Sequence, residues 1–491
     1  MAIRLTPENL SNLSEAVQVP TYNARQLQAG ILHFGVGNFH RAHQAVYLDD
    51  LFNAGDDRDW AIVGASMRPA DEEIRQKLKT QDWLTTVVEQ EMSGSAARVT
   101  ASMVNYLEIG DTFSIIEHLA APSTRIVSLT ITEGGYFIDP ATQHLDANHP
   151  DIVRDVQDRL ANPQTTFGLI LAGLKRRSEA GMLPFTIMSC DNIPGNGHVT
   201  QQVVVGLAEL IDVEFAEWIR ANVAFPNSMV DRITPLTSDR ERKLLEEEFG
   251  ISDNWPVFCE SYRQWVLEDN FPAGRPALEK VGVQFVSDVV PFELMKIRIL
   301  NGGGAIVGYP AALLDIHFVH EAMKHPLINA FFRKVEHDEI IPVVPPVPET
   351  NLNDYYELID RRFSNPKIGD TITRFCHDGT NRQPKFILPT VADRLKAGAS
   401  VDGLALVSAF WCRYCYGETD SGAPIASNDP NWDRLQAHAR RARSSGEAWL
   451  EMTDIFGDLS RNDRYIAAFK AGLESVWSKG TYATLESYLS S

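Results

Sequence analysis

Apolar and polar residues follow two different patterns along the 491 residues of the chain. In the first half, short apolar runs alternate with segments in which apolar residues recur at helical spacing. This alternation is typical of a parallel sheet with crossover helices. The clearest predicted strands are Gly30–Gly37, Trp60–Ser66, Arg125–Thr132 and Phe185–Asp191. The predicted helices between them include Arg41–Asn53, Phe113–His118 and Val199–Asn222.

After about residue 285 the pattern becomes helical. The segments 318–340 and 400–491 have the spacing of amphipathic helices. The proline-rich run Pro342–Pro348 predicts an extended connector. We therefore predict an α/β protein with a sheet domain at residues 1–285 and a mostly α-helical domain at residues 286–491.

Composition narrows the class of protein. The formal net charge of −20 argues against nucleic acid or an anionic membrane as a partner. The longest apolar run, Ala305–Leu314, is far short of the roughly 20 residues of a membrane span, and the first residues lack the apolar core of a signal peptide. Five cysteines are a sparse, odd set that fits a reducing compartment. These features predict a cytoplasmic protein.

Two short motifs have a redox-like or metal-like spacing. Cys412 and Cys415 form a lone C-x-x-C, and no second pair or thioredoxin-like context accompanies it. His317, His320 and Glu321 have the spacing of metal ligands, yet histidines three residues apart more often cap or pack a helix. We predict helix packing for both motifs and no metal site.

The first predicted strand ends in "HFGVGNFHRAHQA", which contains G-x-G before a predicted helix. The first glycine permits a tight turn, and the second lets the backbone approach a pyrophosphate. The third glycine of the usual fingerprint is absent, because His40 stands there, so an ordinary strand-to-helix turn is the alternative. Asp71, after the second strand, fits the ribose hydroxyls of NAD. Arg68 and the long spacing from Gly35 leave NADP open as the less favoured cofactor.

The stretch "MKIRILNGGGAIVGY" (Met295–Tyr309) raises a separate question. Lys296 and Asn301 lie within one half of a helical cylinder, with Glu293 one turn before the lysine. Each glycine in a helix interior costs about 1 kcal/mol relative to alanine. Three glycines in a row therefore predict either a helix end or the close approach of a ligand or another backbone.

Several motifs together carry a family resemblance. In chain order they are "GVGNFHRAH", "SLTITEGGY", "MSCDNIPGNG", "FPNSMVDRITP", "WVLED" and "MKIRILNG". In this order they resemble the long-chain, polyol-specific dehydrogenases, and among these the mannitol-type members most closely. The resemblance implies a Rossmann-type N-terminal domain, a largely helical C-terminal domain, NAD as cofactor, and no catalytic metal. It also implies oxidation of a secondary alcohol of an open-chain polyol to a ketose, and the reverse.

The resemblance also implies roles for single residues. Lys296 matches the general base, Asn192 and Asn301 match the two amides that hold the reacting oxygen, and Glu293 matches a carboxylate that gates a water path to the lysine. Positions that contact or frame the polyol are Asp231, Arg374, Arg382 and Lys385. Positions of the cofactor site are Gly35, Gly37, Asn38, Phe39, His40, Arg41, Asp71 and Glu133.

These residue types suit the chemistry. When a hydride leaves carbon, the hydroxyl proton must leave as well, and a lysine accepts it if its pKa falls from about 10.4 toward neutrality. Burial and the positive nicotinamide ring both act in that direction. Two asparagine amides steady the charge that develops on the oxygen. Without the resemblance, Lys296 reads as a surface lysine with a buried stem, Asn192 as a turn residue, Asn301 as a helix cap and Arg374 as a member of a surface ion pair.

One position departs from the family pattern. Mannitol-type members carry a histidine three residues after the second asparagine, and Gly304 stands there. Three explanations are open. The chain is a natural variant with altered substrate preference, it carries an engineered substitution at this position, or it is a nucleotide-binding protein without catalysis. We favour an active enzyme, because the lysine and both asparagines are present. Arabinitol, sorbitol and hexuronates remain alternative substrates, since Arg374 and Arg382 also suit a carboxylate.

Overall fold

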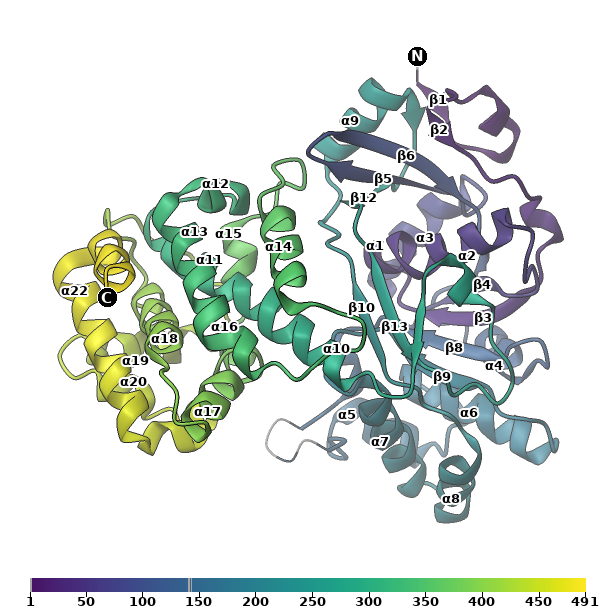
Figure 1. Cartoon of the computed structure of the whole chain (residues 1–491). Coiled ribbons are helices and arrows are strands. Elements are labelled where there is room, and N and C mark those ends of the chain that lie inside the picture. The colour runs from purple at the N-terminus through teal and green to yellow at the C-terminus, as the bar shows by residue number, and fades with distance from the viewer. Residues whose placement is uncertain (1, 140–141, 143) are drawn as a thin grey trace. The chain divides into compact units, whose positions relative to one another are not determined.

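Five parallel strands form the central sheet of the first part of the chain (Figure 1). In spatial order they are β7 (Met103–Tyr106), β4 (Ala61–Ala65), β3 (Ala29–Phe34), β8 (Ile126–Leu129) and β9 (Thr186–Ser189). The chain runs from β3 outward to β4 and β7, then returns to β8 and β9 on the other side. This order is that of a Rossmann fold, and it places a topological switch point between β3 and β8. The four strands predicted from the sequence correspond to β3, β4, β8 and β9.

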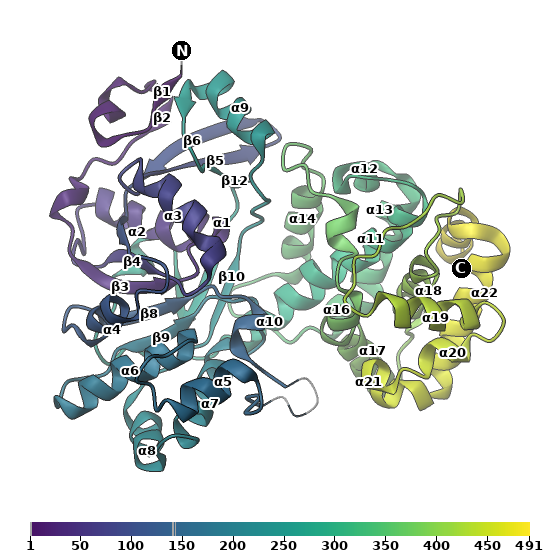
Figure 2. The ribbon, with the colours of Figure 1, turned by 180° about the vertical axis from the view of Figure 1, so that it is seen from behind.

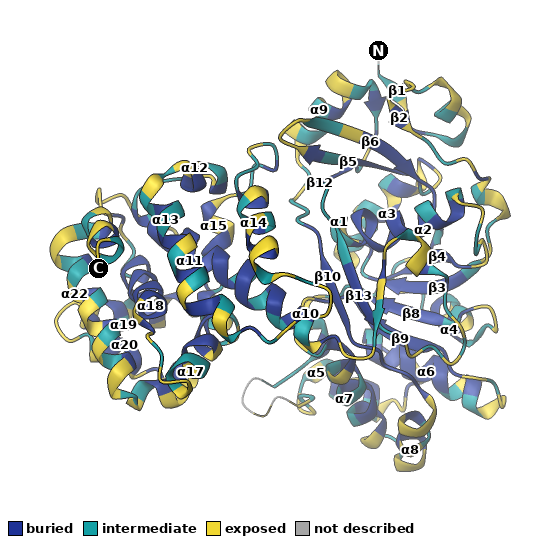
Figure 3. Ribbon diagram, in the orientation of Figure 1, coloured by how far each residue is buried: buried dark blue, intermediate teal, exposed yellow. Residues whose placement is uncertain are grey.

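Both faces of this sheet are buried, as a parallel sheet requires. Ile31 of β3 packs into one hydrophobic cluster, whereas its neighbours Leu32 and Phe34 belong to another cluster on the opposite face. β4, β8 and β9 are dark blue along their length in Figure 3 for this reason. Continuous apolar runs in the sequence therefore reflect strands covered by helices on both sides.

The structure describes residues 2–139, 142 and 144–491, and the chain divides into two units, Met1–Val289 and Val290–Ser491. Further strands of the first unit are β1 (Ile3–Arg4), β2 (Val17–Gln18), β5 (Thr85–Glu91), β6 (Gly94–Thr100), β10 (Ser228–Asp231), β11 (Ile251–Ser252), β12 (Val257–Glu260), β13 (Gln264–Glu268) and β14 (Gln284–Val286). They form a four-stranded sheet β12-β5-β6-β2, a three-stranded sheet β10-β13-β14 and the pair β1-β11.

Helices cover these sheets. The α-helices of the first unit are α1 (Asn38–Ala42), α2 (Gln44–Asn53), α3 (Glu72–Lys79), α4 (Thr112–Ala120), α5 (Pro150–Gln157), α6 (Thr166–Glu179), α7 (Asn196–Glu209), α8 (Val213–Asn222) and α9 (Asp239–Phe249). Its 3₁₀ turns are η1 (Pro7–Asn12), η2 (Ala24–Gln26), η3 (Pro69–Asp71), η4 (Glu133–Tyr136) and η5 (Leu278–Val281).

The described part of the second unit is helical (Figure 2). Its α-helices are α10 (Val290–Met295), α11 (Gly302–Leu313), α12 (Val319–Lys324), α13 (Pro326–Val335), α14 (Leu352–Phe363), α15 (Ile372–Phe375), α16 (Gly379–Phe386), α17 (Leu388–Lys396), α18 (Asp402–Cys415), α19 (Trp432–Ala442), α20 (Glu447–Leu450), α21 (Thr453–Phe456) and α22 (Asp463–Leu489). Two π turns, η6 (Lys296–Asn301) and η7 (Glu336–Ile340), and the 3₁₀ turns η8 (Ile341–Val343) and η9 (Gly457–Arg461) complete it. This confirms the predicted fold class.

Two predicted helices are wrong in their extent: Arg41–Asn53 is broken at His43, between α1 and α2, and Val199–Asn222 is broken at Asp212. The predicted helix Val199–Asn222 is two helices, because Asp212 leaves the helical conformation and its side chain accepts a hydrogen bond from the Phe215 amide at the start of α8. The segment 318–340 is also interrupted, at His325. The residue before a proline avoids the helical region, so α12 ends and α13 begins at Pro326.

Among the described residues, none of the helices has the length and apolar character that a membrane crossing requires.

Candidate functional site

The carboxyl ends of β3, β4, β8 and β9 share one edge of the central sheet, because these strands are parallel neighbours. Gly35 and Gly37 follow β3 directly. Gly35 has a φ of +95°, and a Cβ there would overlap the Thr130 carbonyl oxygen, so only glycine fits. Gly37 is exposed, and a Cβ there would meet only the Gly35 oxygen at 3.9 Å. Its bare backbone is therefore open to a ligand that approaches the turn.

His40, which stands in place of the third glycine of the fingerprint, is buried beneath this turn. Its imidazole stacks on that of His33 from β3, with 3.5 Å between ring centroids and 13° between planes. His33 in turn bonds to Ser128 Oγ at 2.8 Å and contacts the Gly35 carbonyl at 3.1 Å. Burial, with His33 and Arg41 beside it, holds the pKa of His40 well below its usual range. A flat, neutral ring thus replaces the glycine where helix and strand pack closely.

Asn38, Phe39 and Arg41 also brace the turn from within. Arg41 is fully buried and donates to the Trp255 carbonyl and, at 2.7 Å, to Asn38 Oδ1. The Asn38 amide donates to the Pro235 carbonyl at 3.3 Å, and Phe39 stacks on His43 at 4.8 Å. The side chains of Asn38, Phe39 and Arg41 therefore contact other parts of the protein. The exposed glycine backbone is the part of the motif that faces outward.

Asp71, the predicted ribose ligand, lies in η3 beyond the end of β4. Ser66 donates to Asp71 Oδ2 at 2.6 Å and accepts from the Arg68 amide at 3.0 Å. The Ser66 hydroxyl therefore holds the Asp71 carboxylate near the end of β4, although Asp71 lies far from Gly35 in the sequence. Arg68 itself is exposed.

The tails of β8 and β9 are tied together by a residue that the sequence analysis did not single out. Asp191 is buried, and its carboxylate accepts the amides of Ile131 at 3.1 Å and Thr132 at 2.8 Å. Thr132 has φ +64° and ψ 165°, a conformation that costs of order 1–3 kcal/mol outside glycine. Glu133 and Asn192, the predicted ligands on these two tails, are both exposed. In the sequence, the one sign of a role for Asp191 was its position at the end of a predicted strand.

Asp231, a predicted substrate ligand, is buried at the end of β10 and pairs with Gln264 of β13 in an antiparallel ladder. Ser228, at the start of β10, donates to the Ser189 carbonyl of β9 at 2.6 Å. The strand that ends in Asp231 is thus joined directly to the strand that precedes Asn192.

In the second unit, Lys296 and Asn301 mark the two ends of the π turn η6. A π turn closes hydrogen bonds between residues five apart, and the Gly302 amide accordingly bonds to the Ile297 carbonyl. Lys296 and Asn301 are themselves five apart, so the turn brings them to one side of the helix, closer than the α-helix that the sequence suggested. Lys296 and Glu293, one turn before it, are both buried. Bulges of this kind are frequent at functional sites.

The glycine run does not end a helix, because α11 starts at Gly302 and continues through it. A Cβ at Gly302 would lie 3.3 Å from the Phe386 carbonyl oxygen, and one at Gly303 would lie 2.8 Å from the Phe332 ring. A Cβ at Gly304 would meet the Phe375 ring at an ordinary 3.6 Å. Close packing explains the first two glycines, and Gly304 has room for a Cβ.

The basic residues predicted to frame the substrate lie on α15 and α16, which pack against α11 and η6. Arg374 is exposed and makes a bidentate ion pair with Asp370. The Arg382 guanidinium donates to the Arg374 carbonyl at 3.0 Å. Burial, with Arg374 acting in the same direction, lowers the pKa of Arg382. Lys385 is exposed on the same helix as Arg382. Arg374 and Arg382 are thus adjacent.

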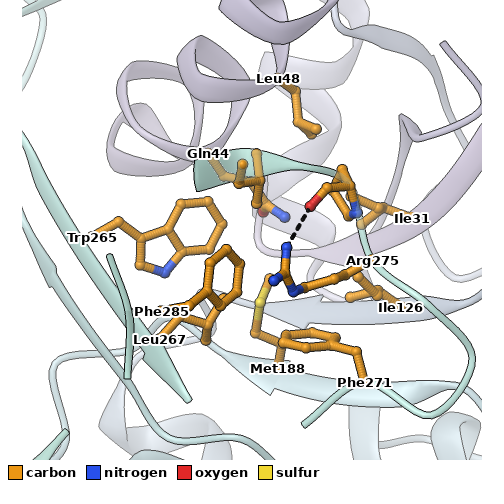
Figure 4. Close-up of a pocket in the computed structure, with 12 residues that line it drawn as sticks. Ile31, Gln44, Leu48, Ile126, Met188, Trp265, Leu267, Phe271, Arg275 and Phe285 are labelled. Carbon is orange, nitrogen blue, oxygen red and sulfur yellow. Dashed lines mark hydrogen bonds between the residues drawn. The ribbon is translucent and has the colours of Figure 1, made fainter. Parts of the chain in front are cut away.

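A small cavity of the first unit, the C-x-x-C motif and the metal-like motif do not form a site of this kind. A cavity in the first unit has about 10 Å³, roughly one water molecule. Aromatic and aliphatic side chains surround it, and Arg275 lies over the Phe285 ring at 3.5 Å (Figure 4). Among the described residues no three His, Cys, Asp or Glu side chains converge as metal ligands. Cys412 and Cys415 are buried thiols in α18, and Glu321 accepts the Phe318 amide at 3.3 Å at the start of α12.

A Rossmann sheet with a bare glycine turn and an acidic residue beyond its second strand is typical of a dinucleotide-binding protein. Family models for the mannitol dehydrogenase Rossmann domain and the mannitol dehydrogenase C-terminal domain match residues 29–280 and 288–477. The chain belongs to the mannitol dehydrogenase family.

Individual relatives match along the whole chain. A mannitol 2-dehydrogenase of Cereibacter sphaeroides is 56% identical, over 97% of this chain and 100% of its own. Another from Neosartorya fischeri is 41% identical over 99% of both. The structure of Pseudomonas fluorescens mannitol 2-dehydrogenase in a ternary complex with NAD and D-mannitol has a TM-score of 0.91, with 40% identity over 99% of this chain and 100% of that one. A substrate-free D-sorbitol dehydrogenase structure has a TM-score of 0.89 and 33% identity, over 98% and 100%.

Proposed function

We propose that the protein catalyses the NAD-dependent oxidation of mannitol to the ketose fructose, and the reverse reduction. The observation that carries the proposal is the 56% identity with a mannitol 2-dehydrogenase over 97% of the chain. The relative of known structure binds NAD and D-mannitol together, which supports both the cofactor and the substrate. Five buried free thiols support a cytoplasmic location.

The cofactor-binding turn fits a dinucleotide. The bare backbone at Gly37 permits close approach of a pyrophosphate, and Asp71, held by Ser66, fits the adenosine ribose hydroxyls. An acidic group at this place favours NAD over NADP, whose 2′-phosphate it would repel. When NAD is bound, its nicotinamide ring accepts the hydride that leaves the alcohol carbon.

The protein's own residues move the proton and hold the oxygen. Lys296 takes the hydroxyl proton, and the amides of Asn192 and Asn301 donate hydrogen bonds to the oxygen as negative charge develops on it. Each such donor is worth about 3 kcal/mol in comparable sites. Glu293, one turn from Lys296, passes the proton toward water. Lys296 is buried, which supports a place inside the site and not on the surface.

The remaining polar residues bind the polyol chain. Asp231 accepts hydrogen bonds from substrate hydroxyls, and Arg374, Arg382 and Lys385 donate them. The adjacent placement of Arg374 and Arg382 supports a shared role.

The test is a comparison of initial rates of NADH and NADPH oxidation with fructose, with other ketoses and with keto-uronates. We expect rapid turnover of fructose with NADH and slow turnover with NADPH. Faster turnover of a keto-uronate would contradict the substrate, and NADH binding without turnover of any compound would contradict catalysis.

Sorbitol is a second candidate polyol. The 33% identity with a D-sorbitol dehydrogenase supports it, as does Gly304, which lacks the side chain that mannitol-type members carry there. Fructose reduction yields mannitol or sorbitol according to the face that receives the hydride. Identification of the polyol product by chromatography therefore separates the two candidates.

A further inference from the structure

We propose that Asp191 is a positioning residue of the reaction, which holds the strand tail that ends in Asn192 in a fixed relation to the tail that carries Glu133. The inference rests on the proposed function, because Asp191 acts through Asn192 and does not itself touch the substrate.

The contacts of the Asp191 carboxylate cross from one strand tail to the other. β8 and β9 are parallel neighbours with Leu129 opposite Ser189, so their tails leave the sheet side by side. Oδ1 accepts the Thr132 amide at 2.8 Å, and Oδ2 accepts the Ile131 amide at 3.1 Å. Two consecutive amides of the β8 tail therefore converge on one side chain of the β9 tail.

A third donor fixes the rotation of the carboxylate. Tyr136, fully buried in η4, donates its hydroxyl to Asp191 Oδ2 at 2.7 Å and bonds to Ser189 Oγ at 2.6 Å. Burial and the charge of Asp191 raise the pKa of Tyr136 well above its usual range, so the phenol keeps its proton. Asp191 accepts from three donors, which an asparagine amide in its place could not do.

The backbone of the β8 tail requires such a partner. Thr132 occupies a left-handed conformation that glycine favours, directly before Glu133. The bond from its amide to Asp191 Oδ1 holds the residue in this conformation. Without the carboxylate we expect the tail to relax and Asn192 to lose its fixed orientation.

The network extends to the strand that ends in Asp231. The Asp191 carbonyl accepts Asn196 Nδ2 at 3.0 Å, and the same amide nitrogen donates to the Ser228 carbonyl of β10 at 2.8 Å. Asn196 Oδ1 accepts the Ser228 amide at 2.9 Å. Through Asp191 and Asn196, the tails that precede Glu133, Asn192 and Asp231 form one hydrogen-bonded assembly.

The chain offers a matched control. Asp155 is also a buried carboxylate that accepts two consecutive amides, from Gln164 at 2.6 Å and Thr165 at 3.1 Å, and one hydroxyl, from Thr165 at 2.6 Å. It joins α5 to the start of α6 instead of joining two strand tails. Asp155→Asn therefore removes the same kind of clamp at a place without a role in the reaction.

The experiment measures kcat and KM for mannitol and NAD in the full-length protein. We expect Asp191→Asn to lower kcat about 10- to 100-fold, the scale of a misplaced reacting group, and Asp155→Asn to leave kcat within about two-fold of the wild type. Tyr136→Phe, which removes only the hydroxyl, should lower kcat by a smaller factor. This variant keeps the test open if Asp191→Asn does not fold.

The decisive readout is non-additivity with Asn192→Ala. If Asp191 acts through Asn192, then Asp191→Asn, or Tyr136→Phe, changes kcat by less than about three-fold in the Asn192→Ala background. If Asp191→Asn lowers kcat as much in the Asn192→Ala background as in the wild type, its role is purely structural. The same holds if Asp155→Asn lowers kcat equally. Either result would overturn this inference but not the proposed function. If the Asn192→Ala variant has the same kcat as the wild type, the proposed role of Asn192 is wrong and the inference fails with it.

Discussion

Glu336 is a carboxyl group with no exposed surface, placed against the glycine run of the second unit. Its Oε1 lies 3.2 Å from the position of a Cβ at Gly303, and neither of its oxygens has a hydrogen-bond partner among the described residues. Burial raises its pKa well above the usual range of a glutamic acid. Burial therefore favours the protonated, neutral form of the side chain.

This gives a pH-dependent prediction for Glu336→Gln. Below about pH 4.5 folded and unfolded chains both carry the proton, whereas above it only the unfolded chain releases it, so the free energy of unfolding falls as pH rises toward the folded-state pKa. We expect the Gln variant to have a higher Tm than the wild type near pH 8 and a similar Tm near pH 4. Thermal denaturation at both pH values measures this.

Asp338→Asn, on the exposed side of the same π turn, is the control and should show no such pH dependence. A Glu336→Gln variant that is less stable than the wild type near pH 8 would mean that the carboxyl is charged and paired.

Gly304 provides a second prediction at this scale. A Cβ there would contact the Phe375 ring without overlap, and Arg374 directly precedes this phenylalanine. We expect Gly304→His to raise kcat/KM for mannitol several-fold, because an imidazole adds a polar group that orients the polyol. Steady-state kinetics with mannitol and NAD check this.

Gly304→Ala separates backbone effects from substrate contacts. It should stabilise α11 by up to about 1 kcal/mol, since alanine is the better helix former, and leave kcat/KM unchanged. Equal gains in kcat/KM for the alanine and histidine variants would rule out a contact between the imidazole and the substrate. If Gly304→His does not raise kcat/KM, no binding group is missing at this position.

At the scale of elements, the π turn η6 is the feature that sets the spacing of Lys296 and Asn301. It holds one residue more than an α-helical turn and leads directly into α11. The hydrophobic pattern on either side remains helical, so the extra residue leaves little trace in the sequence. The function of the turn is nevertheless accessible to experiment.

Deletion of Ile297, which is partly exposed, should convert the π turn into an α-helical turn and move Lys296 one position along the helix. We expect kcat to fall by more than about 100-fold, as for a displaced catalytic group, while NADH still binds. Fluorescence titration with NADH and far-UV circular dichroism separate a lost base from a lost fold. Near-normal kcat would show that the spacing of these two residues is unimportant.

The sequence predicted some elements and residues better than others. β3, β4, β8 and β9 were visible because each lies in a continuous apolar run, whereas β2 has only two residues and depends on its pairing with the distant β6. The glycine turn and Lys296 were visible as motifs. The clamp at Asp191 was not, because it depends on which strands become neighbours. His40 looked like a defect in the fingerprint until its packing on His33 was known.

At the scale of the whole molecule, charge is the dominant property. The chain has 65 acidic and 45 basic residues, a net charge of −20. Self-repulsion of this size destabilises a compact state, and salt screens it. We expect Tm at about pH 7.5 to rise when NaCl is raised from about 0.01 to about 0.1 M, which shortens the screening length from about 30 to about 10 Å.

Calorimetry at the two salt concentrations measures this effect. Near the sequence pI of about 5.1 the net charge vanishes, and the rise should vanish with it. A salt effect of equal size at both pH values would point to specific ion binding instead of screening.

The order of strands in the central sheet has a consequence for protein engineering. Ser66 and Asp71 lie beyond β4, on one side of β3, whereas the tails joined by Asp191 follow β8 and β9 on the other side. Under the proposed function, the residues that choose the cofactor and those of the first unit that meet the polyol lie on opposite flanks of β3. Under that function, we expect a library at positions 66–71 to change the preference between NAD and NADP without altering stereochemistry, and a library at positions 131–133 to change both properties.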